Sequence, residues 1–194
     1  MFALALCVAM LVIGSMAGPR PPYEEDRRNF DEQEIQNFLK LAGKLYVRMR
    51  NYKQGTNFKC HYVEKVGAEG EHSYVYTLKA RNGSGYFGNN ITVTPMRTGV
   101  HNKDNAVQYT APKSDQVIVK LMTKNTDNSC FIFVRNITES KTKSGPPKGC
   151  DLLMTANTVG GNIPEHCEKV FRNNCFGENV TLYANDCQGN QKSL

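Results

Sequence analysis

The sequence lacks the short motifs that mark familiar catalytic sites. It contains no Gly-x-Ser-x-Gly, no His-Glu-x-x-His and no phosphate-binding glycine loop, and its four histidines lie far apart in the chain. Neighbouring acids such as Glu24 and Glu25 lie in a polar segment, where solvated carboxylates are the simplest interpretation. We therefore expect a protein that is not an enzyme and that holds no cofactor.

A long apolar segment is present only at the start of the chain. Residues 2–16 are almost wholly apolar and uncharged, and Ser15-Met16-Ala17 is the small-x-small pattern that signal peptidase accepts. The run is shorter than the ~20 residues that a membrane-spanning helix needs, and a proline-rich segment follows it at once. We expect residues 1–17 to be a signal peptide, with a retained anchor as the less favoured alternative, and the mature protein to be secreted.

Cysteine spacings typical of zinc sites are absent, so no metal site is expected. Cleavage after Ala17 would remove Cys7 and leave an even set of cysteines. In an oxidising compartment such a set predicts three disulfides. The remaining cysteines are Cys60, Cys130, Cys150, Cys167, Cys175 and Cys187.

The sequence has no stripe of one charge. Its net charge is +6, but the lysines and arginines are scattered, which excludes nucleic acid as an expected partner. Asparagines in Asn-x-Ser/Thr sequons are spread along the chain and agree with a secretory route. We expect glycans on Asn82, Asn90, Asn136 and Asn179.

The N-terminal part divides into a tail and a helix. Residues 18–30 are polar, charged and proline-rich, which predicts a flexible tail. Asp31 and Glu34 have the spacing of a capping box, so we expect a short helix that ends at Gly43 and seals the core. Residues 31–194 suit a single domain. The apolar residues on one face of the expected helix are Ile35, Phe38, Leu39 and Ala42.

Beyond Gly43 the sequence reads as short strands separated by Gly, Asn, Asp, Ser and Pro clusters. No long helix lies between them, which disfavours a parallel sheet. A single helix is expected at about 164–173, followed by an extended tail at 179–184. This order predicts an all-β fold, an eight-stranded antiparallel lipocalin barrel with a short N-terminal helix and one C-terminal helix packed outside. The expected strands are 44–52, 58–66, 73–81, 90–96, 105–111, 116–123, 129–138 and 149–156.

Several segments resemble the tick salivary lipocalins, the group that includes the histamine-binding proteins. They are the residues around Cys60-His-Tyr62, Cys150-Asp-Leu152 and the stretch from Ile163 to Phe171, and the resemblance covers most of residues 31–188. The stretches 45–52 and 165–173, together with Cys60-His-Tyr62, are most similar to the japanin branch. The resemblance implies a secreted salivary protein that modulates the host immune response, notably dendritic cells, with a sterol-like ligand in its barrel.

Two features depart from the pattern of these relatives. The chain has no tryptophan, so the Gly-x-Trp signature of ordinary lipocalins is missing, and Gly43-Lys-Leu45 stands in its place. The biogenic-amine signature is half present. Cys150-Asp-Leu152 fits its first part, whereas the nearest match to its second part is Glu168-Lys-Val-Phe171.

The strands favour an apolar ligand site. A buried ammonium needs carboxylates, and the strands offer mainly Glu64 and Asp151. Strand alternation sets the inward face, because Lys120 and a glycan on Asn136 should point outwards. A ligand-free barrel filled by its own side chains is the alternative. We expect the ligand to contact Leu45, Val47, Met49, Val63, Tyr76, Leu78, Ile91, Val93, Val117, Val119, Leu121, Phe131 and Phe133.

Three functions remain open from the sequence. The leading hypothesis is a salivary lipocalin that binds a small hydrophobic, sterol-like ligand and acts on host immune cells or a host receptor. The second is a scavenger of biogenic amines such as histamine, or of lipid mediators. The third is a module that binds a receptor or complement factor with an empty barrel.

The strand order also limits the disulfide pairing. Cys60 begins the second strand and Cys187 ends the tail, so their bond would clamp the tail to the barrel wall, which is also the lipocalin habit. The strands that begin at Cys130 and Cys150 should form a hairpin, and antiparallel pairing places these two cysteines at opposite ends. We therefore expect the bonds Cys60–Cys187, Cys130–Cys167 and Cys150–Cys175.

Overall fold

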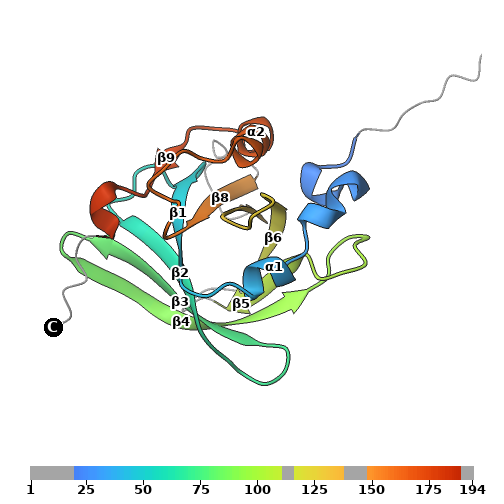
Figure 1. Ribbon diagram of the computed structural model, residues 1–194, viewed down its shortest axis with the longest axis horizontal. Helices are drawn as coiled ribbons and strands as arrows, with labels where there is room; N and C mark the ends of the chain where they lie inside the picture. The colour runs from blue at the N-terminus through green and yellow to red at the C-terminus, as the bar shows by residue number, and fades with distance from the viewer. Residues whose placement is uncertain (1–19, 111–115, 138–147, 189–194) are drawn as a thin grey trace, which may run out of the picture.

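The computed structural model describes residues 20–110, 116–137 and 148–188 (Figure 1). The expected signal peptide, residues 1–17, lies outside the described residues. Among the helices of the described part, none is long and apolar enough to cross a membrane.

Eight antiparallel strands close into a barrel, as the sequence predicts. Each strand pairs with the next along the chain, β8 pairs with β1, and β1 pairs with β2. A short strand β9 (Val180–Thr181) adds to β1 from outside. The barrel strands are β1 (Lys44–Arg50), β2 (Lys59–Ala68), β3 (Tyr74–Asn82), β4 (Gly85–Met96), β5 (Ala106–Thr110), β6 (Gln116–Lys124), β7 (Cys130–Asn136) and β8 (Lys148–Thr155).

Two α-helices accompany the barrel within the described residues. Helix α2 (Glu165–Asn174) packs on the outside against β6, β7 and β8 (Figure 1). In the single turn of α1 (Gln36–Leu39), Phe38 and Leu39 pack into the apolar cluster inside the barrel. A short 3-10 turn, η3 (Asn185–Cys187), ends the described chain. The number, order and positions of the strands and of α2 agree with the sequence prediction.

The N-terminal helix is shorter than expected, and its predicted start at Asp31 is wrong. The buried side chain of Gln33 donates a hydrogen bond to the Met122 carbonyl (3.0 Å), and the Ile35 amide donates to the Asp104 carbonyl (2.9 Å). These hydrogen bonds attach the chain to the barrel. A helix that began at Asp31 would use the Ile35 amide for a hydrogen bond within the helix instead. Only the single turn of α1 remains α-helical.

The expected flexible tail at residues 18–30 is largely folded, which corrects that prediction. Its residues form the 3-10 turns η1 (Tyr23–Glu25) and η2 (Arg27–Glu32), and Glu24 is buried. The Glu24 carboxylate is ion-paired with Lys148 of β8, and Glu25 is ion-paired with Lys120 of β6. The polar composition that suggested mobility instead supplies anchors to the barrel wall.

The barrel wall is buried on both faces where α2 covers it. Along β7, Phe131 and Phe133 belong to the interior cluster, while Ile132 and Val134 belong to an outer cluster beneath α2. A strand with two buried faces has a continuous apolar sequence, as Cys130–Val134 of β7 does.

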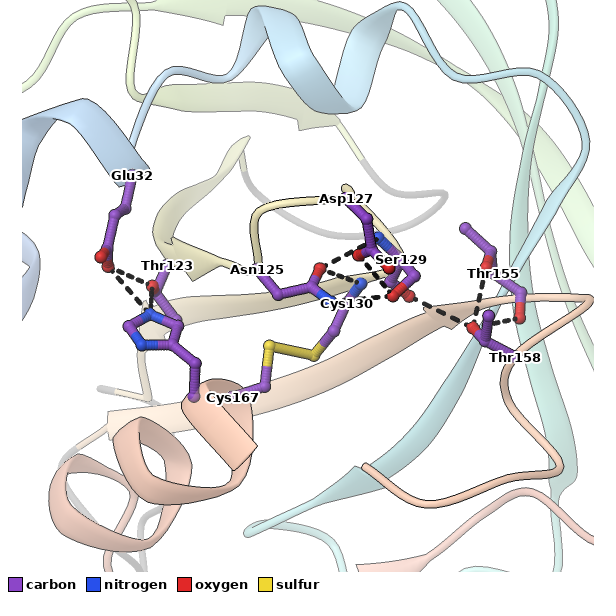
Figure 2. The surroundings of a disulfide bond; sticks show 10 residues. Glu32, Thr123, Asn125, Asp127, Ser129, Cys130, Thr155, Thr158 and Cys167 are labelled. Carbon is purple, nitrogen blue, oxygen red and sulfur yellow. Dashed lines mark hydrogen bonds and ion pairs between the residues drawn. A yellow bond between two sulfur atoms is a disulfide. The ribbon is translucent and has the colours of Figure 1, made fainter. Parts of the chain in front are cut away.

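Three disulfides tie the C-terminal part to the barrel. They are Cys60–Cys187, Cys130–Cys167 and Cys150–Cys175, the pairs expected from the sequence. Cys130 is opposite Met154 and Cys150 is opposite Val134, which separates the two cysteines along the β7–β8 hairpin. Figure 2 shows Cys130–Cys167 joining β7 to the first turn of α2, close to Thr123 and Glu32.

Candidate ligand-binding site

The barrel encloses a cavity of about 330 Å³ that is lined by side chains from α1 and all eight strands. Phe38 of α1 borders it, with its ring stacked on Tyr76 (5.6 Å between ring centres) and edge-on to Phe133 (4.9 Å). A cavity of a few hundred Å³ with mostly apolar walls is the usual form of a small-molecule site.

Eight of the thirteen residues expected to contact a ligand line this cavity. They come from β1, β2, β3, β4, β6 and β7, and strand alternation places them on the inner face. These residues are Val47, Val63, Tyr76, Leu78, Ile91, Val93, Val119 and Phe133.

The other five expected residues do not line the cavity. Leu45, Leu121 and Phe131 are buried in the interior cluster. Val117 is opposite Tyr109 in the β5–β6 ladder but stands outside the lining set. Met49 packs against the outer cluster, because an irregularity in the β1–β8 register between Val47 and Met49 shifts its side chain to the other face.

The sequence did not single out a polar cluster in the cavity wall, which we define as Arg50, Tyr52, Tyr109, Arg135 and Asp151. The Tyr52 hydroxyl donates a hydrogen bond to Asp151 Oδ2 (2.7 Å). The guanidinium carbons of Arg50 and Arg135 lie 4.8 Å and 4.7 Å from the centre of the Tyr52 ring, within cation–π range.

The electrostatics of the polar cluster follow from burial. Burial raises the pKa of Asp151 and of Tyr52, and the negative charge of Asp151 raises the pKa of Tyr52 further. Burial, assisted by the charge of Arg50, lowers the pKa of His61, which also lines the cavity, to about 4. At neutral pH His61 is therefore uncharged.

Two buried polar atoms of the cavity wall have no hydrogen-bond partner among the described residues. They are Arg50 Nε and the hydroxyl of Tyr76. Since unpaired buried polar atoms are costly, these two mark places where a bound molecule could supply a partner.

A signal for part of the polar cluster was present in the sequence. If Asn136 points outwards as a glycan acceptor, Arg135 beside it must point inwards. Five apolar residues were also missed, and they are Phe38 of α1, Ala80 of β3, Phe87 of β4, Val107 of β5 and Leu153 of β8. Within the described residues, a group with metal-like spacing is formed by Cys60, Asp186 and Cys187, but its two sulfur atoms are joined in a disulfide.

Solved structures with the same fold are distant in sequence. Insecticyanin from the tobacco hornworm Manduca sexta matches with a TM-score of 0.59 at 11% identity, over 79% of this chain and 82% of that chain. AM182 in its serotonin complex matches at 0.55 and 15% identity, over 88% and 94%. Apocrustacyanin C2 matches at 0.52 and 16% identity, over 76% and 80%. At these identities the likeness shows the lipocalin fold.

The family is shown by a separate comparison. No curated protein matches the chain by sequence. The family model described as tick histamine binding protein matches residues 23–189. Because this match spans most of the sequence, as well as the barrel and its cavity, the chain belongs to the tick histamine binding protein family.

Proposed function

We propose that this protein is a secreted carrier that binds one small hydrophobic, sterol-like molecule in its barrel. The observation that carries the proposal is the cavity of about 330 Å³, whose walls are mainly apolar and aromatic. The transfer of a hydrophobic ligand from water to apolar walls is favourable, and a few polar groups fix its orientation. The hydroxyl of Tyr76, which lacks a partner among the described residues, offers such a contact to a ligand oxygen.

A biogenic amine is the second candidate, supported by the name of the family and by the serotonin complex of AM182. Buried ammonium groups require carboxylates that are not already balanced by other cations. Among the described lining residues Asp151 is the single carboxylate, and it shares the polar cluster with Arg50 and Arg135. Glu64 lies outside the lining set. The charge of the cavity wall therefore favours the hydrophobic ligand over the amine.

We further propose that the protein acts on the host immune response, with dendritic cells as the expected target. The support is the similarity of residues 45–52 and 165–173 to the japanin branch, together with the secretory features of the sequence. A host-cell assay with the ligand-loaded and the ligand-free protein tests whether the ligand is needed for this activity.

The binding proposal is tested on protein secreted from insect cells and purified without detergent. Native mass spectrometry followed by lipid extraction should find one small apolar molecule per chain. Tight binding of histamine by calorimetry would favour the second candidate instead. An empty barrel that binds neither would favour a receptor-binding or complement-binding module.

A matched pair of variants tests whether the ligand occupies the cavity. Val119 lines the cavity, whereas its neighbour Ile118 lies on the same strand and is 40% exposed. Val119→Trp should fill the cavity and reduce bound ligand at least tenfold. Ile118→Trp should retain the ligand, and circular dichroism checks that both variants are folded.

A further inference from the structure

The wall of the cavity carries more positive than negative charge. The buried Arg50 and the half-buried Arg135 face a single carboxylate, Asp151, among the described lining residues, and the exposed Lys79 adds a further positive charge to the wall. No ion pair within 4.0 Å joins Asp151 to either arginine in the described structure. The carboxylate instead accepts the Tyr52 hydroxyl, so at least one guanidinium charge is left without a direct counter-charge.

Arg50 has an unused hydrogen-bond donor in this wall. Its side chain is buried, with only 6% of the residue exposed. One terminal nitrogen donates to the Lys53 carbonyl (3.2 Å), but Nε has no partner among the described residues. A guanidinium presents its donors in a planar fork that suits carboxylate or sulfate oxygens, which would complete this set.

Both guanidiniums are held in place before any ligand arrives. Arg50 and Arg135 each lie within 5 Å of the Tyr52 ring centre, and Tyr52 is itself fixed by its bond to Asp151. Two like charges around one ring repel each other, and an anion between or beside them would relieve that repulsion. A neutral hydroxyl could accept a hydrogen bond there but would leave the charge unbalanced.

We infer that the polar cluster is a subsite for an anionic head group, and that the ligand is an acidic amphiphile with a carboxylate or a sulfate on a hydrophobic body. This inference rests on the proposed function, since the apolar part of the same cavity holds the body. Arg50 and Arg135 bind the anion, and Tyr52 positions them. The Tyr76 hydroxyl contacts an oxygen on the body of the ligand.

Matched ligands that differ only in the head group test the inference. The delipidated protein is titrated with cholesterol sulfate and cholesterol, and with oleic acid and oleyl alcohol. The acidic member of each pair should bind at least tenfold more tightly than the neutral member. The difference between the sterol pair and the acyl pair identifies the hydrophobic body.

Variants assign the preference to the polar cluster. Arg50→Met and Arg135→Met should each reduce the acid-to-neutral ratio at least fivefold. Arg48→Met is the matched control, because Arg48 is on the same strand as Arg50 but lies over Tyr183 (5.8 Å) and is not among the cavity-lining residues. Asp151→Asn, which removes the single carboxylate at nearly constant shape, should increase the ratio and serves if an arginine variant does not fold.

The outcomes distinguish a failure of the head-group assignment from a failure of the carrier function. Equal binding of the acidic and neutral members, or tighter binding of a cationic amphiphile such as dodecylamine, would overturn the head-group assignment and leave the carrier function standing. Failure of both pairs to bind would overturn the carrier function, and the assignment with it.

Discussion

Tyr52 shows how one side chain organises the polar end of the cavity. Its ring contacts two guanidiniums, and its hydroxyl donates to Asp151 at 2.7 Å. Tyr52→Phe keeps the ring and removes this hydrogen bond, so the carboxylate loses a partner inside the barrel. We expect the free energy of unfolding to fall by about 1–2 kcal/mol, as measured by urea denaturation.

A second tyrosine provides the control for this variant. Tyr183 is as buried as Tyr52, but its hydroxyl makes no hydrogen bond within the described residues. Tyr183→Phe should change the stability by less than about 0.5 kcal/mol. Equal losses in the two variants would show that the bond to Asp151 contributes nothing specific.

His61 makes the stability depend on pH. Burial and the nearby charge of Arg50 lower its pKa to about 4 in the folded protein, whereas an unfolded histidine titrates near about 6.5. The unfolded state therefore binds the proton more readily between these values. The contribution of the neutral imidazole is complete above about pH 6.5 and is lost as the pH falls towards about 4.

The measurement compares urea denaturation of the parent and of His61→Gln from pH 7 to pH 4. The parent should lose more stability over this range than the variant, because the variant cannot take up that proton. Other titrating groups are common to both proteins, so their effects cancel in the difference. Parallel curves would mean that His61 titrates alike in both states.

Residue-level predictions from sequence succeeded where strands are regular and failed where they are not. Alternation correctly placed Val119 and Phe133 in the cavity wall, since β6 and β7 keep their register at these positions. It failed at Met49, because no sequence signal marked the irregularity after Val47. The charges of the polar cluster were missed for another reason. Arg50 and Asp151 are far apart in sequence, and their neighbourhood exists only once β1 pairs with β8.

At the scale of elements, the N-terminal 3-10 turns η1 and η2, which we call the N-terminal strap, pack against β6 on the barrel wall. Glu32 accepts a hydrogen bond from Tyr23 (3.1 Å) and one from Thr123 of β6 (2.6 Å), and its carboxylate lies 3.0 Å from His166 Nε2 of α2. Figure 2 shows Glu32 reaching towards Thr123 from a segment distant in sequence. Through Glu32 the strap therefore connects β6 of the barrel with helix α2.

Deletion of residues 18–30 from the mature protein tests the strap. It removes Glu24 and Glu25 and leaves their partners Lys148 and Lys120 unpaired at partly buried positions. We expect a loss of about 2–4 kcal/mol and a lower melting temperature by calorimetry. Deletion of residues 18–21 is the control and should change little, since it keeps Pro22, whose carbonyl accepts the hydrogen bond of the Glu25 amide in the first 3-10 turn. A thermally stable Δ18–30 protein would restore the original prediction of a flexible tail.

Local sequence patterns specify the strands, whereas tertiary hydrogen bonds specify the N-terminal strap. Strand existence follows from local patterns, namely alternating β-branched and aromatic residues between turn residues. All eight barrel strands were predicted, although β4 begins at Gly85 and not at residue 90. The N-terminal strap was not, because 3-10 turns carry no periodic apolar pattern. Its stability comes from bonds such as that of Gln33 to the Met122 carbonyl, which local sequence does not encode.

At the scale of the whole molecule, the disulfides hold the C-terminal part on the barrel. Cys60–Cys187 joins residues 127 positions apart, while Cys130–Cys167 and Cys150–Cys175 fix the two ends of α2. A helix of ten residues would be marginal alone, so its tertiary attachment maintains it. Because α2 then covers the outer faces of β7 and β8, these strands can be apolar on both sides while the cavity stays open between them and β3.

The ladder between β4 and β5 is short, and it leaves much of β4 paired on one side. β4 pairs with β5 only through Thr94–Met96, and from Gly85 to Val93 it has β3 as its single partner among the described residues. An exposed edge of this length can pair with a second chain and lead to aggregation. The sequon at Asn90 lies in the middle of the edge, and Asn90 is exposed.

We expect a glycan on Asn90 to protect this edge. Thr77 Oγ1 donates to Asn90 Oδ1 (2.5 Å), which orients the amide while leaving Nδ2 as the attachment atom. Asn90→Gln and Thr92→Ala both abolish the sequon and should give dimers or larger species in size-exclusion chromatography with light scattering. Asn136→Gln is the control, because β8 pairs with the whole of β7 and β6 pairs with its residues Phe131–Val134, so little of β7 is left as an edge and this variant should remain like the parent. If all three variants elute as the parent does, or if intact-mass analysis finds Asn90 unmodified in a monomeric parent, the edge needs no glycan, and the short, polar Gly88-Asn89-Asn90 stretch suffices to prevent strand addition.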